Sequence, residues 1–556
     1  MRKQTFLVMA IATAAVSLFF VASDLVGAEG SAKIALAGQV GSKEEGPLEG
    51  VLVSAKKDGS TITITVVSDQ QGRYSFPSAK VGPGHYAIKI RAAGYDLDGP
   101  KAVEVGPEKT ASADLTLRKA KNIVSQLTNS EWLASIPGTE TQKKQLLGCT
   151  NCHTLERTAT STHDAEDFLP VLERMASYAN MSFPLHPQRR VSPPNLVRRF
   201  GAGTDDLAGY LATINLSSGP TWRYALKTLP RPTGRSTRVV ITEYDLPRQT
   251  IEPHDVIVDP DGMVWFSNFG EQFFGRLDTR TGQVKEYPVP LMRPGFPTGM
   301  LDLETDQEGD FWLSLMYQNG IAKFDKKTET FKIWQLPPEF TNIETQQSMV
   351  GPQHWGVDGK VWLNDAGGAT GVYRLDMATG KFERWEPYKD LPGPHSVYGL
   401  YADSKNNLFY LDFGGENIGR IDAKTGVLRL IPTPTPRSRP RRGRMDGQDR
   451  LWFAEFYGGK IGMFDTRTET FQEWSVPTPH TAPYDVVLAE NGEVWGAGME
   501  ADRIMRMDPK TGQFTEYPLP RQTNIRRVFV DNSTTPVTFW VGNNEGASII
   551  KLEPLD

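Results

Sequence analysis

The chain has 556 residues, of which 39% are hydrophobic, so it can build sizeable cores. Its length is typical of roughly three or four domains. Lysine and arginine (61) nearly balance aspartate and glutamate (66), which leaves a net charge of −5, so we expect no nucleic-acid partner.

The N-terminus has the pattern of a secretory signal peptide. A short basic lead, Met1–Lys3, precedes an almost wholly apolar run from Phe6 to Ala22, and Val26–Ala28 offers small residues for cleavage. The alternative is a membrane anchor, but the run is short beside the about 20 residues that a spanning helix needs. We therefore expect residues 1–28 to be removed and the mature protein to be exported, to the bacterial periplasm or beyond, with no membrane span.

Residues 31–118 are predicted to form a β-sandwich. Runs of alternating and β-branched residues are separated by Gly, Pro and Asp turns, which is typical of short antiparallel strands. The segments Gly38-Gln39-Val40, Gly72-Arg73-Tyr74-Ser75-Phe76 and Ala93-Gly94-Tyr95 resemble a carboxypeptidase regulatory-like domain. That resemblance implies a spacer or adhesion module without catalysis.

Residues 119–220 change to a helical period and contain the motif Cys149-Thr150-Asn151-Cys152-His153. Two thiols about one helical turn apart suit two thioether bonds to one haem, and the next histidine can bind the iron. A structural zinc site needs four ligands, and the chain has no other cysteine. A dithiol redox pair usually lies in a βαβ setting, which is lacking here. With its closing helix through Leu207-Ala208-Gly209-Tyr210-Leu211, the region resembles a small, all-α class I-type cytochrome c with one covalent haem c.

The second axial ligand of that haem has several candidates: Met175, Met181, His163 and His186. The resemblance favours Met175, which lies on the predicted middle helix, while Met181 follows that helix in a loop. Methionine opposite histidine suits electron transfer with a redox partner protein, whereas an open position suits binding of a small molecule. Either methionine is otherwise explained by core packing.

Residues 237–556 contain an internal repeat. Asp261-Gly262-Met263-Val264-Trp265-Phe266 returns as Asp358-Gly359-Lys360-Val361-Trp362-Leu363, and weaker copies follow. Seven aromatic anchors recur 43 to 50 residues apart, at Trp265, Trp312, Trp362, Phe409, Trp452, Trp495 and Trp540. A period in the mid-forties with several short strands indicates a seven-bladed β-propeller. The segment 239–247 is predicted to be the missing fourth strand of blade seven, which closes the ring.

The amino-acid sequence of these blades resembles the virginiamycin B lyase (streptogramin lyase) family of seven-bladed propellers. The resemblance implies a catalytic histidine on an inner strand, a glutamate fourteen residues later and a magnesium ion near the channel. His254 fits the histidine position, but the residue fourteen further on is Asn268. Glu455 fits the glutamate position of another blade, and its own partner position holds Arg441. The acid–base pair is therefore split or lost.

Polar residues at equivalent blade positions are expected to converge on one mouth of the propeller channel. Besides His254 and Glu455 they include Asn268, Asp365, Asp412 and Arg441. Such a ring suits a divalent cation, or a small-molecule or anionic ligand held by the arginine-rich run 437–444. The alternative is a polar funnel filled with water and a solvated loop.

The sequence as a whole predicts a multidomain, mainly β protein: a sandwich, a small all-α cytochrome c domain and a propeller. The leading hypothesis is an exported mono-haem c-type cytochrome that transfers one electron, with a propeller that binds a substrate or partner. The alternative is an enzyme whose active site lies in the propeller channel, with His254 as general base and the haem as electron port. A third hypothesis is a scaffold or sensor that reads out ligand binding through the haem.

Overall fold

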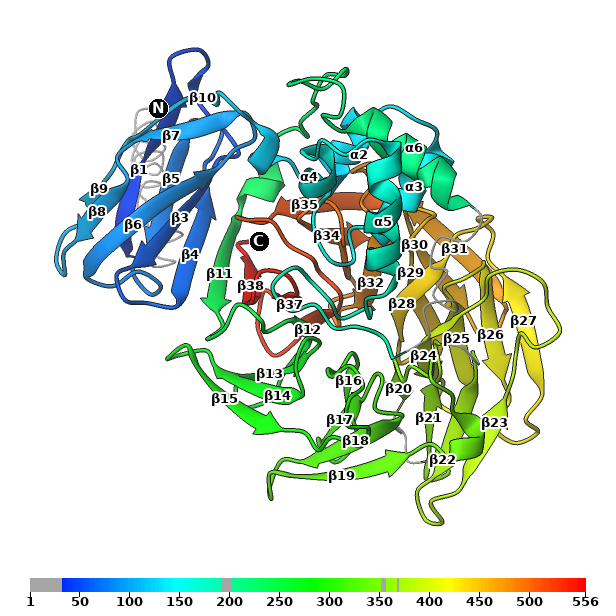
Figure 1. Ribbon diagram of the computed structural model, residues 1–556. Coiled ribbons are helices and arrows are strands. Elements are labelled where there is room, and N and C mark those ends of the chain that lie inside the picture. The colour runs from blue at the N-terminus through cyan, green and yellow to red at the C-terminus, as the bar shows by residue number, and fades with distance from the viewer. Residues whose placement is uncertain (1–32, 192–202, 352–356, 368–369) are drawn as a thin grey trace, which may run out of the picture.

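The computed structural model describes residues 33–191, 203–351, 357–367 and 370–556 (Figure 1). The predicted signal peptide lies outside these residues. The described chain is multidomain and mainly β, with an N-terminal sandwich, a group of helices and a C-terminal propeller-like region. Among the helices of the described residues, none is both long and apolar enough to cross a membrane.

The N-terminal unit is a β-sandwich, as predicted. One sheet has the order β2-β1-β10-β7, with β5 and β9 also paired to β1, and the other contains β4-β3-β6-β8. Alternate residues such as Leu36, Val53 and Phe76 are buried between the sheets. The strands are β1 (Ile34–Ser42), β2 (Gly46–Pro47), β3 (Leu52–Lys57), β4 (Ile62–Val67), β5 (Arg73–Pro77), β6 (Gly84–Arg91), β7 (Tyr95–Gly99), β8 (Ala102–Val105), β9 (Ala111–Ser112) and β10 (Leu115–Lys119).

Short helices follow, and we call residues 124–226 the helical unit. They are η1 (Val124–Gln126), α2 (Asn129–Ser135), α3 (Glu140–Gln145), η2 (Leu146–Gly148), α4 (Leu155–Ala159), α5 (Ala165–Ala176) and α6 (Thr204–Ile214). Capping boxes at Thr128, Thr139 and Asp164 begin α2, α3 and α5 by satisfying backbone N–H groups. Trp132 and Phe168 lie in the shared core.

The C-terminal region consists of four-stranded antiparallel sheets that we call blades. Blades one to six are β12–β15, β16–β19, β20–β23, β24–β27, β28–β31 and β32–β35. The first strands of neighbouring blades contact one another around a closed ring, so they line the central axis. The predicted anchors are all buried, and in three blades the indole N–H donates to an aspartate six residues earlier, at Asp259, Asp306 and Asp446.

The blade strands have these bounds: β12 (Pro253–Val258), β13 (Met263–Asn268), β14 (Phe273–Asp278), β15 (Gln283–Pro288), β16 (Leu303–Thr305), β17 (Phe311–Ser314), β18 (Gly320–Asp325), β19 (Thr330–Gln335), β20 (Val350–Gly351), β21 (Lys360–Asn364), β22 (Val372–Asp376), β23 (Phe382–Trp385), β24 (Val397–Ala402), β25 (Leu408–Asp412), β26 (Asn417–Ile421), β27 (Leu428–Pro432), β28 (Pro440–Met445), β29 (Arg450–Glu455), β30 (Lys460–Asp465), β31 (Thr470–Ser475), β32 (Pro483–Leu488), β33 (Val494–Gly498), β34 (Arg503–Asp508) and β35 (Gln513–Pro518). Two further short helices are η5 (Gly234–Thr237) and η6 (Pro338–Phe340).

Blade seven is completed by a strand from the other end of the region. β36 (Val528–Asp531), β37 (Thr538–Asn543) and β38 (Ser548–Pro554) are joined by β11 (Val239–Asp245), which pairs antiparallel with β38. This confirms the predicted closing strand. The other edge of β11 pairs with β4 of the sandwich, so one eight-stranded sheet runs through both units. This junction was not predictable from the sequence, because pairing between distant strand edges leaves no local pattern.

Candidate functional site

A cavity of about 320 Å³ lies in the helical unit and is lined by the residues of the cysteine motif. Cys149, Cys152 and His153 reach it from the loop between η2 and α4, and Met175 reaches it from α5. Apolar side chains form much of the remaining wall: Phe168, Val171, Leu172 and Leu211. The structure thus gathers two thiols, an imidazole and a thioether around one space.

The His153 ring is held by a hydrogen bond to the main chain. Its Nδ1 lies 2.9 Å from the Thr154 carbonyl oxygen. Because a carbonyl oxygen only accepts, Nδ1 carries the hydrogen, and Nε2 keeps a lone pair that can bind a metal. Burial lowers the pKa of His153, so the ring is neutral at neutral pH.

The four candidates for the second axial position are separated by the structure. Met175 and His163 line the cavity. Met181 is fully buried instead among propeller side chains, including Phe269. His186 lies outside the lining of the cavity. His163 is about half-exposed, with Nδ1 3.9 Å from a carboxylate oxygen of Asp167.

The loop that carries the cysteines is bonded to the propeller. The Thr150 hydroxyl donates to Glu500 Oε1 at 2.7 Å. Asn524 Nδ2 donates to the Thr150 carbonyl oxygen, and Arg526 Nη2 donates to the carbonyl oxygen of Asn151, each at 2.9 Å. The two residues between the cysteines are therefore held by blades six and seven.

The rest of the helical unit covers the same mouth of the propeller (Figure 1). Trp132 belongs to a core that includes Tyr484 and Met499 of the propeller, and Met181 belongs to another with Phe269. The Gln188 amide donates to the carbonyl oxygens of residues 270 and 298. Contacts on opposite sides of the ring place the helical unit over the channel.

His254 lies under this cover, on β12. Its side chain has no exposed surface, and its Nδ1 lies 2.6 Å from Asp255 Oδ1. The ring packs 4.8 Å from the Phe269 ring and 6.2 Å from that of Tyr484. Burial lowers the pKa of His254 to about 3, so it is a neutral imidazole. The helical unit therefore closes the approach to His254 from this mouth.

Glu455, the other predicted catalytic residue, has different neighbours. It is fully buried at the end of β29, beside Glu473 and Lys460 of its own blade. Burial raises its pKa to about 8, and the nearby Glu473 adds to the rise. The structure does not assemble His254 and Glu455 as an acid–base pair, since each is held by a separate group of side chains.

Asn268, Asp365 and Asp412 share one structural role. Asn268 and Asp412 end the second strand of their blades, and Asp365 directly follows the second strand of its own. Each accepts from backbone N–H groups of the next turn and of the segment before the first strand. Asp412 also lies 2.8 Å from His395 Nδ1. A repeated polar residue here is explained by turn geometry, and among the described residues no group of three or more His, Cys, Asp or Glu could hold a metal ion.

Arg441 and Arg442 were predicted to belong to one cationic run, but they serve different groups. The Arg441 guanidinium is buried among aromatic rings, with its centre 3.8 Å from the Tyr484 centroid and 4.3 Å from that of Phe413. Arg442 reaches the axis, where it binds both oxygens of Asp255 at 2.9 Å and Asp302 at 2.6 Å. The two are held inside the ring rather than displayed as an anion clamp.

Sequence reasoning missed the residues beneath the cysteine loop. Glu252, Glu500, Glu545 and Arg526 come from the turns at this mouth, before β12, after β33, after β37 and before β36. The available signal was a charged residue within two positions of the strand end in three neighbouring blades. These four residues meet only because the ring of blades closes. The sequence predicted a closed ring, but not which loop residues would face one another in it.

The family model for the virginiamycin B lyase family matches residues 231–500 and 397–554, which together make up more than half of the chain. The chain belongs to the virginiamycin B lyase family. A carboxypeptidase regulatory-like domain matches residues 35–118, within the sandwich. The N-terminal unit and the propeller-like region of this lyase-family member therefore have the two relationships that the sequence predicted.

Two solved structures are similar to this member of the virginiamycin B lyase family. A virginiamycin B lyase from Staphylococcus aureus is 24% identical, covers 56% of this chain and 98% of its own, and has a TM-score of 0.48. A streptogramin B lyase structure is 24% identical, covers 58% of this chain and 100% of its own, and has a TM-score of 0.49. No curated protein gave a significant match.

Proposed function

We propose that the helical unit binds one haem c covalently and that the protein is an exported one-electron carrier. The observation that carries this proposal is the single cavity lined by Cys149, Cys152, His153 and Met175. Two cysteines that can form thioether bonds to the porphyrin, with an imidazole and a methionine sulfur for the iron, are the groups that hold haem c, and about 320 Å³ lies within the usual range of cofactor sites. When bound, the haem supplies reversible one-electron chemistry.

The residues of the chain divide the remaining work. Cys149 and Cys152 would attach the group, and His153 Nε2 would bind the iron while Nδ1–H stays on the Thr154 carbonyl, which fixes the ring and raises its basicity. Apolar side chains exclude water from the cavity. Arg157 and Arg174 also line it and supply positive charge for the two haem carboxylates.

Met175 is the residue we propose for the second axial position. It lines the cavity, whereas Met181 is packed into the propeller contact. His163 also lines the cavity, but its side chain is about half-exposed. Met175 and His153 would together hold the iron, and this pair of ligands would favour the reduced form and leave no position free for a small molecule. Electron exchange with a redox partner protein therefore fits better than ligand sensing. Catalysis in the channel is less favoured, because His254 is fully buried beneath the helical unit.

The test is the optical spectrum of the exported protein, oxidised and reduced, and after denaturation. We expect haem bands that stay with the denatured chain, and a weak oxidised band at ~695 nm that reports Met–iron ligation. Met175→Leu should remove the weak band, and the matched control Met181→Leu should keep it. A colourless protein would overturn the proposal. A haem that lacks the weak band and binds carbon monoxide readily would replace electron transfer with sensing.

A further inference from the structure

Three carboxyls and one arginine lie beneath the loop that carries the cysteines. Glu252 and Glu500 are only 2% and 1% exposed, and Glu545 is half-buried. Arg526 is the cation that faces all three. Three acids with one cation form a group whose charge is not balanced when all are ionised.

Hydrogen bonds connect two of these acids to the loop. Glu500 accepts directly from the Thr150 hydroxyl. Glu545 is connected through Asn524, whose Nδ2 lies 2.6 Å from Glu545 Oε1 and 2.9 Å from the Thr150 carbonyl oxygen. Because Thr150 lies between the two cysteines, both carboxyls are close to the proposed haem attachment.

Few hydrogen-bond donors reach the remaining carboxyl oxygens of the cluster. Glu500 Oε2 and Glu252 Oε2 are buried and have no hydrogen-bond partner within the described ranges. Arg526 directs its donors to Asn524 Oδ1 and the Asn151 carbonyl. A desolvated carboxyl oxygen without a donor is best satisfied by a proton. In keeping with this, burial raises the pKa of Glu500 to about 8 and that of Glu545 to about 7.

Four other titratable groups face the cluster, and each already has a partner. The pairs are Asp502 with Arg91, Glu271 with Arg248, His254 with Asp255 and Tyr484 with Tyr398. Arg248 lowers the pKa of Glu271 against the effect of burial, and burial lowers that of His254. Glu271 therefore stays ionised and His254 stays neutral near neutral pH, so the change of charge near the loop falls to Glu500 and Glu545.

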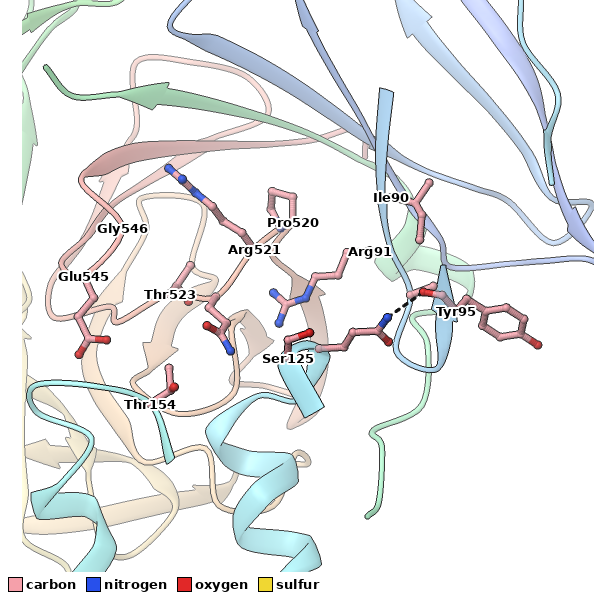
Figure 2. Close-up of a pocket in the computed structure, with 13 residues that line it drawn as sticks. Ile90, Arg91, Tyr95, Ser125, Thr154, Pro520, Arg521, Thr523, Glu545 and Gly546 are labelled. Carbon is pink, nitrogen blue, oxygen red and sulfur yellow. Dashed lines mark hydrogen bonds between the residues drawn. The ribbon is translucent and has the colours of Figure 1, made fainter. Parts of the chain in front are cut away.

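Water can reach the cluster through a second cavity. A space of about 490 Å³ lies where the sandwich, the helical unit and the propeller meet. Figure 2 shows Glu545 and Thr154 on its wall, opposite Arg91 of the sandwich. A cavity of this size, lined in part by polar side chains, has room for several waters. Glu545 therefore has a route for proton exchange that the fully buried acids lack.

We propose that reduction of the cofactor is coupled to uptake of a proton by the Glu500–Glu545 pair, so that the protein carries a proton with its electron. The inference rests on the proposed function. In the balanced step, an external one-electron donor protein is oxidised, the electron is kept by the cofactor, and one proton passes from cavity water to a carboxylate of the pair. Reoxidation reverses both transfers. The physical cause is that added negative charge nearby favours the neutral form of a carboxyl.

The test is the midpoint potential of the haem-loaded protein as a function of pH, together with proton uptake on reduction in weakly buffered solution with an indicator dye. The potential should fall as pH rises through the range around 7 to 8 set by the pair. Glu545→Gln and Glu500→Gln should each flatten that fall. The matched control Glu271→Gln removes a constant negative charge, so it should raise the potential at every pH and leave the slope unchanged.

The outcomes separate this inference from the function on which it rests. A protein without covalent haem overturns the proposed function. A haem protein whose potential does not change with pH in this range, and which takes up no proton, overturns the coupling alone. A slope retained in both variants overturns the assignment to this pair. If the variants fail to fold, dye uptake by the unaltered protein decides the coupling, and reduced-minus-oxidised infrared spectra decide whether a carboxyl gains the proton.

Discussion

The propeller holds its two neighbours in contrasting ways. The sandwich is joined through the backbone, since β4 and β11 pair from Val240 opposite Val66 to Tyr244 opposite Ile62. The helical unit is joined through side chains and loops, with the Thr150–Glu500 bond at its centre. A strand ladder depends little on which side chains are present, whereas docking by side chains depends on their identity and charge. The first junction should therefore tolerate changes of side chain and charge better than the second.

The two junctions also differ in how their charged side chains are paired. Ion pairs surround the sandwich junction, with Lys56 2.5 Å from Asp245 and Lys80 2.6 Å from Glu553. Beneath the cysteine loop, Glu252, Glu500 and Glu545 instead share the one cation Arg526. Stability at the first junction should therefore be lost in acid, and stability at the second should be lost in base.

The largest expected effect comes from breaking the shared sheet. Thr242 lies in the middle of β11, opposite Lys551 on one side and Ile64 on the other. Thr242→Pro removes a backbone donor from a central strand, so we expect a loss of about 3 kcal/mol or more in the free energy of unfolding. Limited proteolysis should then cut both the sandwich and blade seven. Thr242→Ser, which keeps the N–H group, is the control, and an unchanged melting temperature in the proline variant would contradict a shared folding unit.

The second prediction concerns pH at the helical junction. Burial raises the pKa of Glu500 to about 8 in the docked state, while a solvated glutamate titrates near about 4.3. The docked state therefore binds more protons between these values, and docking weakens as pH rises through about 8. At about 1.4 kcal/mol per pKa unit the loss is on the order of a few kcal/mol.

Hydrogen exchange of residues 146–156 measures this loss. Exchange in the unaltered protein, after correction for the intrinsic rate, should accelerate as pH rises toward the pKa of about 8 and level off above it. Glu500→Gln should remove the acceleration. Glu140→Gln, at an exposed carboxylate on α3, should leave it in place. An equal acceleration in strands β4 and β11 would mean that the two junctions do not differ as described.

The contrast also explains what could be predicted from the sequence. The blades were predictable because one pattern of strands and buried aromatics, such as Trp265 and Trp362, repeats at a fixed period. The polar residues at strand ends were read as a ligand ring, yet Asn268 and Asp412 satisfy backbone donors, which a repeat also requires. A polar residue that recurs from blade to blade can therefore reflect a structural requirement as well as a binding site.

The contacts between units left no such pattern. The residues that hold the cysteine loop, Glu500, Asn524 and Arg526, lie about 350 residues or more from Thr150 in the chain. Their only shared signal is a position near a strand end, and no spacing relates them to Thr150, because their meeting depends on ring closure and on how the helical unit docks. The cavity residues were predictable for the opposite reason, since Cys149, Cys152 and His153 are neighbours in one motif.

The smallest expected effect concerns a single ion pair at the sandwich junction. Burial opposes ionisation of Glu553, but Lys80 outweighs it and lowers the pKa of this carboxyl. Lys80→Met should cost about 1 kcal/mol at neutral pH, since Lys551 still contacts Glu553 at 3.0 Å. A lowered folded-state pKa gives stability above the unfolded value that is lost as pH falls through the folded one, so the cost should vanish in acid. Chemical denaturation at several pH values, with Lys89→Met on the exposed face of β6 as the control, measures this. A cost that instead grew in acid would give the sandwich junction the same pH dependence as the helical one, and the difference in charge between the two would be lost.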